Sequence, residues 1–143
     1  MVIVFPLALF VTATVFDLIA LGSDNAAFDE VGYWNITAGI IGAVVAALTG
    51  LLDWTGIPRG TRAKRIGLLH AGANSVVLVL FVISWLTRTD NTGHAASTGV
   101  VIVQVVAVLI SGVAAWFGGE LVDRLGIGVD EDAYANAPSS LAR

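Results

Sequence analysis

The chain of 143 residues contains no cysteine and few charged residues. Without cysteine it forms neither a disulfide nor a thiolate-ligated zinc or iron–sulfur centre. Charged residues make up 13% of the chain, whereas roughly 25% is usual in soluble domains. The net charge of -4 offers no basic surface to a nucleic acid. These shortages exclude a soluble globular domain, and we expect no nucleic-acid partner.

What the chain has in abundance is apolar sequence, with 57% hydrophobic residues and a mean hydropathy of +0.87. The apolar residues form four runs, each close to the roughly 20 residues that a helix needs to cross a bilayer. These runs cover residues 2–21, 33–53, 66–87 and 97–118. They do not alternate with polar residues, as the strands of a membrane β-barrel would. The sequence therefore predicts an all-α protein, a four-helix transmembrane bundle in the lipid bilayer.

Basic residues predict the orientation of the bundle. Four of the seven basic residues lie in the loop at residues 54–65, namely Arg59, Arg62, Lys64 and Arg65. The positive-inside rule places this loop, and therefore both termini, in the cytoplasm. Each of the four tryptophans lies near the end of a predicted span, where an indole ring fits the membrane interface. We expect a multi-pass protein of the bacterial inner membrane.

Residues 1–125 are expected to form one four-span domain, followed at residues 126–143 by a flexible acidic cytoplasmic tail. The first apolar run lacks a basic segment before it and contains Asp17. Both features are unlike a cleaved signal peptide, so we expect this helix to be retained.

Small residues recur at steps of four in the second and fourth spans, where a neighbouring helix can approach closely. The first series is Ala38, Gly42, Ala46 and Gly50, and the second is Ala107, Ser111, Ala115 and Gly119. Packing within the bundle is the favoured interpretation of both series. A homodimer or a larger membrane complex is the alternative.

Polar side chains inside the predicted spans need an explanation, because an ionisable group at mid-helix costs about 2.5–3.5 kcal/mol on insertion scales. Four of them share the predicted cytoplasmic half: Asp53, His70, Asn74 and Glu120. If their faces converge, they would form one pocket able to relay protons, hold a quinone head group or bind a metal or haem. The alternative is structural: Asp53 and Glu120 pair with loop arginines or stay hydrated, and His70 with Asn74, on the same face of one helix, serves interhelical hydrogen bonding.

Two further intramembrane polar residues, Asp17 and Gln104, lie in the predicted outer halves of the first and fourth spans. The other histidine, His94, follows Gly93 in an outer loop and is expected to be solvated. That leaves His70 as the only candidate intramembrane metal ligand among the histidines.

No cofactor is evident from the sequence motifs. Haem b held by two imidazoles needs a second histidine at similar depth. A monomer with one such histidine cannot build that site, although a symmetric dimer could. The chain has no catalytic H-E-x-x-H or G-x-S-x-G motif and no phosphate-binding glycine loop. An enzyme is therefore not favoured.

Several motifs occur in order along the chain: FP at Phe5, FD at Phe16, G-x-x-D ending at Asp53, H-x-x-x-N from His70, and G-G-E-L-V around Glu120. Together they resemble the bacterial family of predicted membrane proteins catalogued as domain of unknown function 2231. The resemblance runs from about Val4 to Val129. It implies a four-helix integral membrane domain, joined in some other proteins to cytochrome-like modules, without an established activity.

The chain departs from that family pattern at its start. The pattern usually opens with His-Pro a few residues before the Phe5-Pro6 pair, and here the sequence begins at Met1 without it. Either the true start lies upstream or this member has lost that histidine. The missing histidine would lie at nearly the same level as His70, where it would restore the haem or metal hypothesis.

Two functions follow as hypotheses. The first is an accessory or structural membrane component in which the polar residues hold the helices together. The second is a redox or proton-handling module, with haem, metal or quinone bound near His70, Asn74, Asp53 and Glu120.

Overall fold

The computed structural model describes residues 4–23, 25–130 and 132–139, and within these ranges it is helical without strands. The four long helices are α1 (Val4–Ser23), α2 (Ala26–Gly56), α3 (Arg62–Leu86) and α4 (Thr98–Gly119). A short 3-10 turn, η1 (Thr92–His94), lies before α4, and a π-helical turn, η2 (Glu120–Arg124), follows it. All four long helices are long and apolar enough to span a membrane. The predicted four-helix bundle is thereby confirmed.

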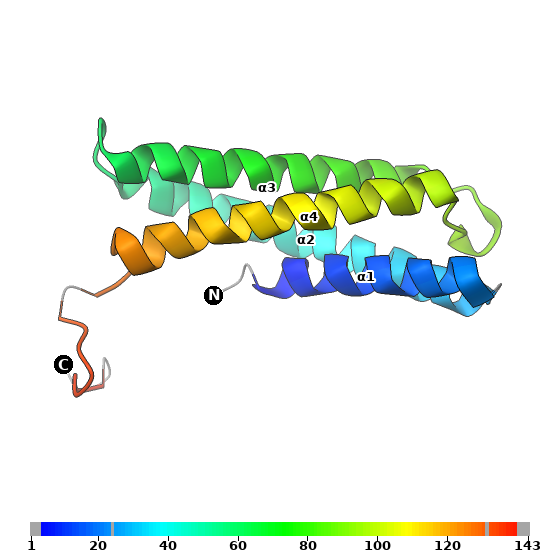
Figure 1. The fold of residues 1–143 in the computed structure, drawn as a ribbon, viewed down its shortest axis with the longest axis horizontal. Coiled ribbons are helices and arrows are strands. Elements are labelled where there is room, and N and C mark those ends of the chain that lie inside the picture. Colours follow the sequence, from blue (N-terminus) through cyan, green and yellow to red (C-terminus); the bar gives the residue numbers. More distant parts are fainter. Residues whose placement is uncertain (1–3, 24, 131, 140–143) are drawn as a thin grey trace.

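The helices run antiparallel to their neighbours in the chain, so the connections alternate between the two ends of the bundle (Figure 1). α1 packs most closely against α2 and α3 against α4, and the pairs α2–α3 and α1–α4 complete the ring. The α2–α3 loop and the end of α4 lie at one end, and the N-terminus of α1 points toward it, although α1 begins beside Gly42, near the middle of α2 (Figure 1). We call that end of the bundle the basic end, after Arg59, Arg62, Lys64 and Arg65. The other end holds the α1–α2 turn and the 87–97 loop, and we call it the acidic end, after Asp17, Asp29, Glu30 and Asp90.

Side-chain caps move two helix starts away from the bounds that hydropathy predicts. α2 begins at Ala26, seven residues before the apolar run, because the Asn25 side chain accepts a hydrogen bond from the Ala27 N–H. α3 begins at Arg62 because the Thr61 hydroxyl accepts from the Lys64 N–H. Hydropathy marks the segment that suits hydrocarbon, whereas the helix continues into polar sequence until its backbone donors are capped.

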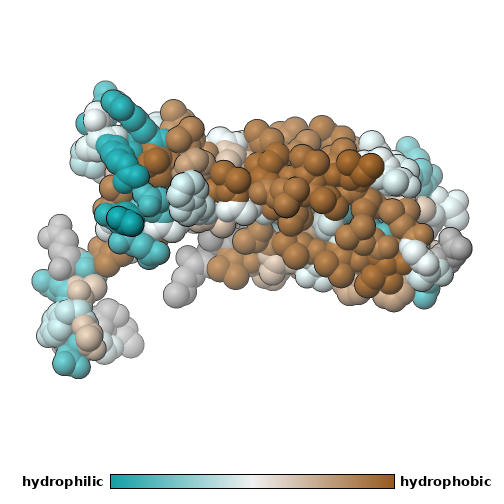
Figure 2. Space-filling view, viewed as in Figure 1, coloured by the Kyte–Doolittle hydropathy of each residue, from teal (hydrophilic) through white to brown (hydrophobic). Residues whose placement is uncertain are grey.

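The core lies at the middle of the bundle and joins all four helices. Phe10 of α1 stacks on Phe81 of α3, with ring centroids 4.1 Å apart and planes within 5°. Ile36 of α2 and Ala107 of α4 are fully buried in the same cluster. The large apolar side chains outside this core face outward, and in Figure 2 they form a hydrophobic belt between hydrophilic ends. Such a belt is the surface that a bilayer requires.

Small residues of α2 allow α1 to approach closely. A Cβ atom on Gly39 would lie 2.6 Å from the Phe10 ring, and one on Gly42 would lie 3.0 Å from Phe5. A Cβ atom on Gly50, the last member of the step-of-four series, would have no neighbouring helix or side chain within 4 Å. In α4 likewise, Ala107 is fully buried and Ala115 is exposed. Only part of each series therefore packs inside the bundle.

The four tryptophans divide into two kinds. Trp34 and Trp116 are 57% and 67% exposed, as expected for interfacial indoles. Trp85 and Trp54 are half-buried and make hydrogen bonds, from the Trp85 indole N–H to the Thr37 hydroxyl and from that of Trp54 to the Lys64 carbonyl. After Arg124 the described part of the tail forms turns with exposed side chains from Gly128 onward.

Candidate functional site

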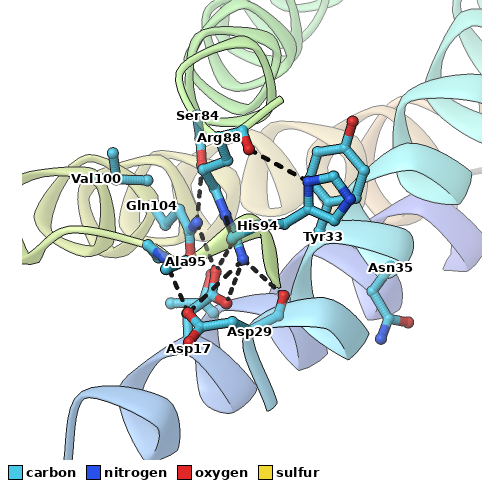
Figure 3. A network of polar contacts seen from close by, with 12 residues as sticks. Asp17, Asp29, Tyr33, Asn35, Ser84, Arg88, His94, Ala95, Val100 and Gln104 are labelled. Atoms are coloured by element: carbon cyan, nitrogen blue, oxygen red, sulfur yellow. Dashed lines mark hydrogen bonds and ion pairs between the residues drawn. The ribbon is translucent and has the colours of Figure 1, made fainter. Parts of the chain in front are cut away.

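A fully buried ion pair occupies the acidic end of the bundle (Figure 3). Arg88 Nη1 lies 2.6 Å from Asp17 Oδ2, and Arg88 Nη2 lies 3.0 Å from Asp17 Oδ1. Both side chains have zero exposure to solvent. Two parallel N–H···O bonds are the strongest arrangement that an arginine makes with a carboxylate. The pair joins α1 to the residue that lies two positions beyond the end of α3.

Two further N–H donors of the Arg88 guanidinium bind backbone carbonyls. Its Nε donates to the His94 carbonyl at 2.7 Å, and Nη2 also donates to the Asp29 carbonyl at 2.7 Å. The Asp29 carboxylate in turn accepts a hydrogen bond of 2.9 Å from the Ala96 N–H. These bonds connect the 87–97 loop to the first turn of α2, so one side chain organises the whole acidic end.

Gln104 adds α4 to the same network. Its Nε2 donates to Asp17 Oδ2 and to the Ser84 hydroxyl, each at 2.8 Å. This orientation of the amide is required, because the reverse would place an oxygen against the carboxylate. The Gln104 Oε1 atom is buried and has no hydrogen-bond partner among the described residues. We call Asp17, Ser84, Arg88 and Gln104, with Asp29, the buried network.

Gly32 of α2 makes room for the buried network. A Cβ atom at this position would lie 2.2 Å from Asp17 Oδ1 and 2.9 Å from Asp17 Cγ. No real Cβ atom occupies such a position, so only glycine lets α2 pass the carboxylate at this distance. Gly32 therefore belongs to the site although it contributes no polar side chain.

His94 is half-buried rather than solvated, so the expectation for this residue was wrong. Its ring stacks on Tyr33 with centroids 3.8 Å apart and planes within 7°, and its Nδ1–H donates to the Arg88 carbonyl at 3.2 Å. The residue adopts a positive φ of 55° beside Gly93, whose φ is 62°. Two successive left-handed residues turn the loop back and carry the imidazole onto the tyrosine, which also faces the Arg88 guanidinium at 5.9 Å.

At the basic end, His70 and Asn74 form a hydrogen-bonded pair one helical turn apart. His70 Nδ1 lies 2.8 Å from the Ala114 carbonyl, which only accepts, so Nδ1 carries the proton. His70 Nε2 is then the acceptor for Asn74 Nδ2 at 3.2 Å, and the same amide nitrogen donates to the His70 carbonyl at 2.8 Å. The imidazole packs against Gly118, whose added Cβ would lie 3.1 Å from the ring. The pair thus ties α3 to α4.

The other two members of the predicted cluster lie elsewhere. Glu120 makes an ion pair of 2.6 Å with Arg62, whose side chain is 60% exposed. Asp53 is exposed on the last turns of α2, and no partner lies beside it among the described residues. The structure therefore brings His70 to Asn74 and Glu120 to Arg62, without gathering the four into one pocket.

The contacts of His70 bear on haem or metal binding. Imidazole binds iron or zinc through an unprotonated nitrogen. In this structure Nδ1 faces a carbonyl and Nε2 faces the Asn74 amide, so ligation would require Asn74 to leave. Within the described ranges no three histidine, aspartate or glutamate side chains converge. The arrangement of these residues does not fit an axial ligand.

The sequence indicates only some members of the buried network. Asp17 and Gln104 stand out as polar residues within apolar runs, whereas Arg88 lies just beyond a run and resembles an ordinary loop residue. One signal could have found it, since Arg88 is the single basic residue among the acidic residues of that end. A carboxylate inside a span demands a counter-charge, and Arg88 is the only nearby source.

Comparison with known proteins agrees with this architecture. No curated protein and no solved structure matches the chain. The model of one family does match, over residues 1–131, which cover the four helices and both polar sites. The chain belongs to the family described as "Predicted membrane protein (DUF2231)".

Proposed function

We propose that the chain is an accessory, non-enzymatic component of a membrane assembly, with its polar residues serving to hold four helices in one arrangement. The observation that carries this proposal is the buried network, in which Arg88 contacts Asp17 of α1, the Asp29 carbonyl of α2 and the loop before α4. A charge so enclosed orients helices and offers no surface to a substrate.

The His70–Asn74 pair supports the same function. His70 Nδ1 is hydrogen-bonded to the Ala114 carbonyl of α4, and Nε2 accepts from Asn74 on the same helix. A hydrogen bond between α3 and α4 is the role of polar side chains that hold membrane helices together. A redox or proton-handling module would need the imidazole, or another titratable group, open to a cofactor or to water.

We place the protein in the bacterial inner membrane with the basic end in the cytoplasm. The basic end carries Arg59 and Arg65 as exposed side chains, and the acidic end carries one arginine, which is buried. This asymmetry is the one that the positive-inside rule associates with a cytoplasmic loop.

The test uses the full chain extracted from its native membrane in mild detergent. Native electrophoresis is expected to place it in a particle much larger than its own 14.8 kDa plus detergent. The purified protein is expected to lack a Soret band and stoichiometric metal. Migration as a free monomer would contradict membership of an assembly.

The His70→Ala variant separates the two hypotheses. We expect it to keep its helicity and its place in the particle, with a loss of stability near the average of about 0.6 kcal/mol for an interhelical hydrogen bond. A chromophore present in the wild type and lost in His70→Ala would overturn the structural role in favour of the redox module. Ser75→Ala, an exposed change on the same helix, serves as the control.

A further inference from the structure

An open groove of about 490 Å³ lies on the outer face of α2, near the acidic end. Its lining residues are Ala27, Glu30, Val31, Trp34 and Asn35. They recur at steps of three and four, so they form one face of a single helix. None of them belongs to the buried network or to the His70–Asn74 pair.

The position of the groove along the membrane normal follows from the length of α2. The helix has 31 residues, or about 46 Å at 1.5 Å per residue, whereas a hydrocarbon core is about 30 Å thick. Between Glu30 and Asp53 the sequence has no Asp, Glu, Lys or Arg, and this stretch is the one that suits hydrocarbon. Glu30 is therefore the first residue at head-group level, and Trp34 lies one turn deeper at the boundary.

The groups that line the groove accept hydrogen bonds or attract cations. The Glu30 side chain is exposed and has no partner among the described residues. Asn35 Nδ2 donates to the Val31 carbonyl at 2.9 Å, and its amide oxygen has no hydrogen-bond partner in the part of the chain that the structure describes. Figure 3 shows this amide standing apart from the buried network. The indole ring of Trp34, 57% exposed, adds a π face.

Neighbouring rings hold Trp34 in place. Tyr33 meets it edge to face at 5.5 Å and 82°, and His94 does so at 6.4 Å and 84°. Because the loop that carries His94 is tied down by Arg88, the indole has a fixed backing on this side. A ring that is already fixed in the free protein loses little conformational entropy when a ligand binds.

The net negative charge of the acidic end favours a ligand group with a positive charge. Five acidic residues lie in this part of the sequence: Asp17, Asp24, Asp29, Glu30 and Asp90. The single base, Arg88, is buried against Asp17 and cannot serve a ligand. A bare anion is therefore repelled, and a cation is attracted to Glu30.

We propose that this groove binds the primary ammonium head group of a membrane phospholipid. A primary ammonium donates N–H bonds to the Glu30 carboxylate, and its charge lies against the ring of Trp34, the neighbour of Glu30 one helical turn away. The lipid, rather than a free amine in water, is the source because the groove lies where head groups begin, and the exposed Ile41 lies two turns deeper on the same face of α2. This site is independent of the proposed function.

The experiment uses the full chain in a mild detergent, with bound lipid counted by native mass spectrometry. The probes are phosphatidylethanolamine, phosphatidylglycerol, which lacks the ammonium, and glycerophosphoethanolamine, which lacks the acyl chains. We expect one phosphatidylethanolamine to be retained in preference to phosphatidylglycerol. Equal retention of the two lipids would overturn the proposal, and displacement by equimolar glycerophosphoethanolamine would overturn the lipid as source.

Two matched pairs of variants locate the site. Glu30→Gln and Trp34→Leu are each expected to lower the affinity for phosphatidylethanolamine about twofold to fivefold. Their controls are Asp90→Asn, another exposed acid of the same end, and Trp116→Leu, an exposed tryptophan of α4. Unchanged helicity shows that each variant is folded. If the controls lose as much affinity as the groove variants, the groove is not the site.

Discussion

Arg88 places a full positive charge inside an apolar bundle, and its neighbours explain why it is tolerated. Its guanidinium makes two bonds to Asp17 and two to backbone carbonyls, so the charge is neutralised and its nitrogens are satisfied. Buried ion pairs often add little net stability compared with apolar residues of similar volume. Removing one partner is different, because the other charge is then buried alone.

We therefore expect Asp17→Asn to destabilise the protein by about 3–5 kcal/mol, since it leaves Arg88 without its counter-charge. The measurement is the free energy of unfolding, followed by helicity as a mild detergent is replaced by dodecyl sulfate. The double variant Asp17→Leu with Arg88→Met removes both charges and should recover part of the loss. An Asp17→Asn variant as stable as the wild type would show that the pair contributes nothing.

At the scale of the helix, the spacing of small residues decides which face packs. Steps of four advance about 40° beyond a full turn, because an α-helix has 3.6 residues per turn. The series from Ala38 to Gly50 thus rotates away from α1, and its last member is exposed. Apart from Tyr33, the buried residues of α2 follow mixed steps of three and four, at Gly32, Ile36, Gly39 and Gly42. Members of both predicted series, Gly42 and Ala107, pack inside the bundle, and the helix period limits how far the rest of each series takes part.

Two alanine substitutions in α2 test this packing. Gly32→Ala is expected to cost about 1–3 kcal/mol, because its Cβ would overlap the Asp17 carboxylate, which is held in place by Arg88. Gly50→Ala, with nothing within 4 Å, should be neutral or stabilise the helix by up to about 1 kcal/mol. Both are measured by the same unfolding assay. Equal effects of the two changes would contradict the close approach of α1 to Gly32.

For the molecule as a whole, the absence of cysteine makes the orientation easy to test. Single cysteines replace Thr92 in the acidic end and Ala135 in the tail, both exposed positions. In intact cells a membrane-impermeant maleimide is expected to label the Thr92→Cys variant and to leave Ala135→Cys unlabelled until the membrane is opened. The reverse pattern would invert the proposed orientation and place the lipid-binding groove in the other leaflet.

Hydropathy and charge along the chain suffice to predict the lipid surroundings, the number of helices and the chemical character of each end. Four apolar runs separated by short polar loops allow little else, because backbone groups in hydrocarbon must be hydrogen-bonded within helices. The contact between His70 and Asn74 is also predictable from the sequence, because the two residues lie four positions apart on one helix.

Which distant polar residues meet depends on how the helices pack in three dimensions. Asp17 joins Arg88 across 71 residues of sequence and Gln104 across 87, while Asp53 and Glu120 separate although both lie toward the basic end. Hydropathy reports the depth of a residue in the membrane, and a contact depends in addition on the rotation of each helix and on its neighbours. Those two properties arise from packing, here from Gly32 beside Asp17 and from Phe10 against Phe81.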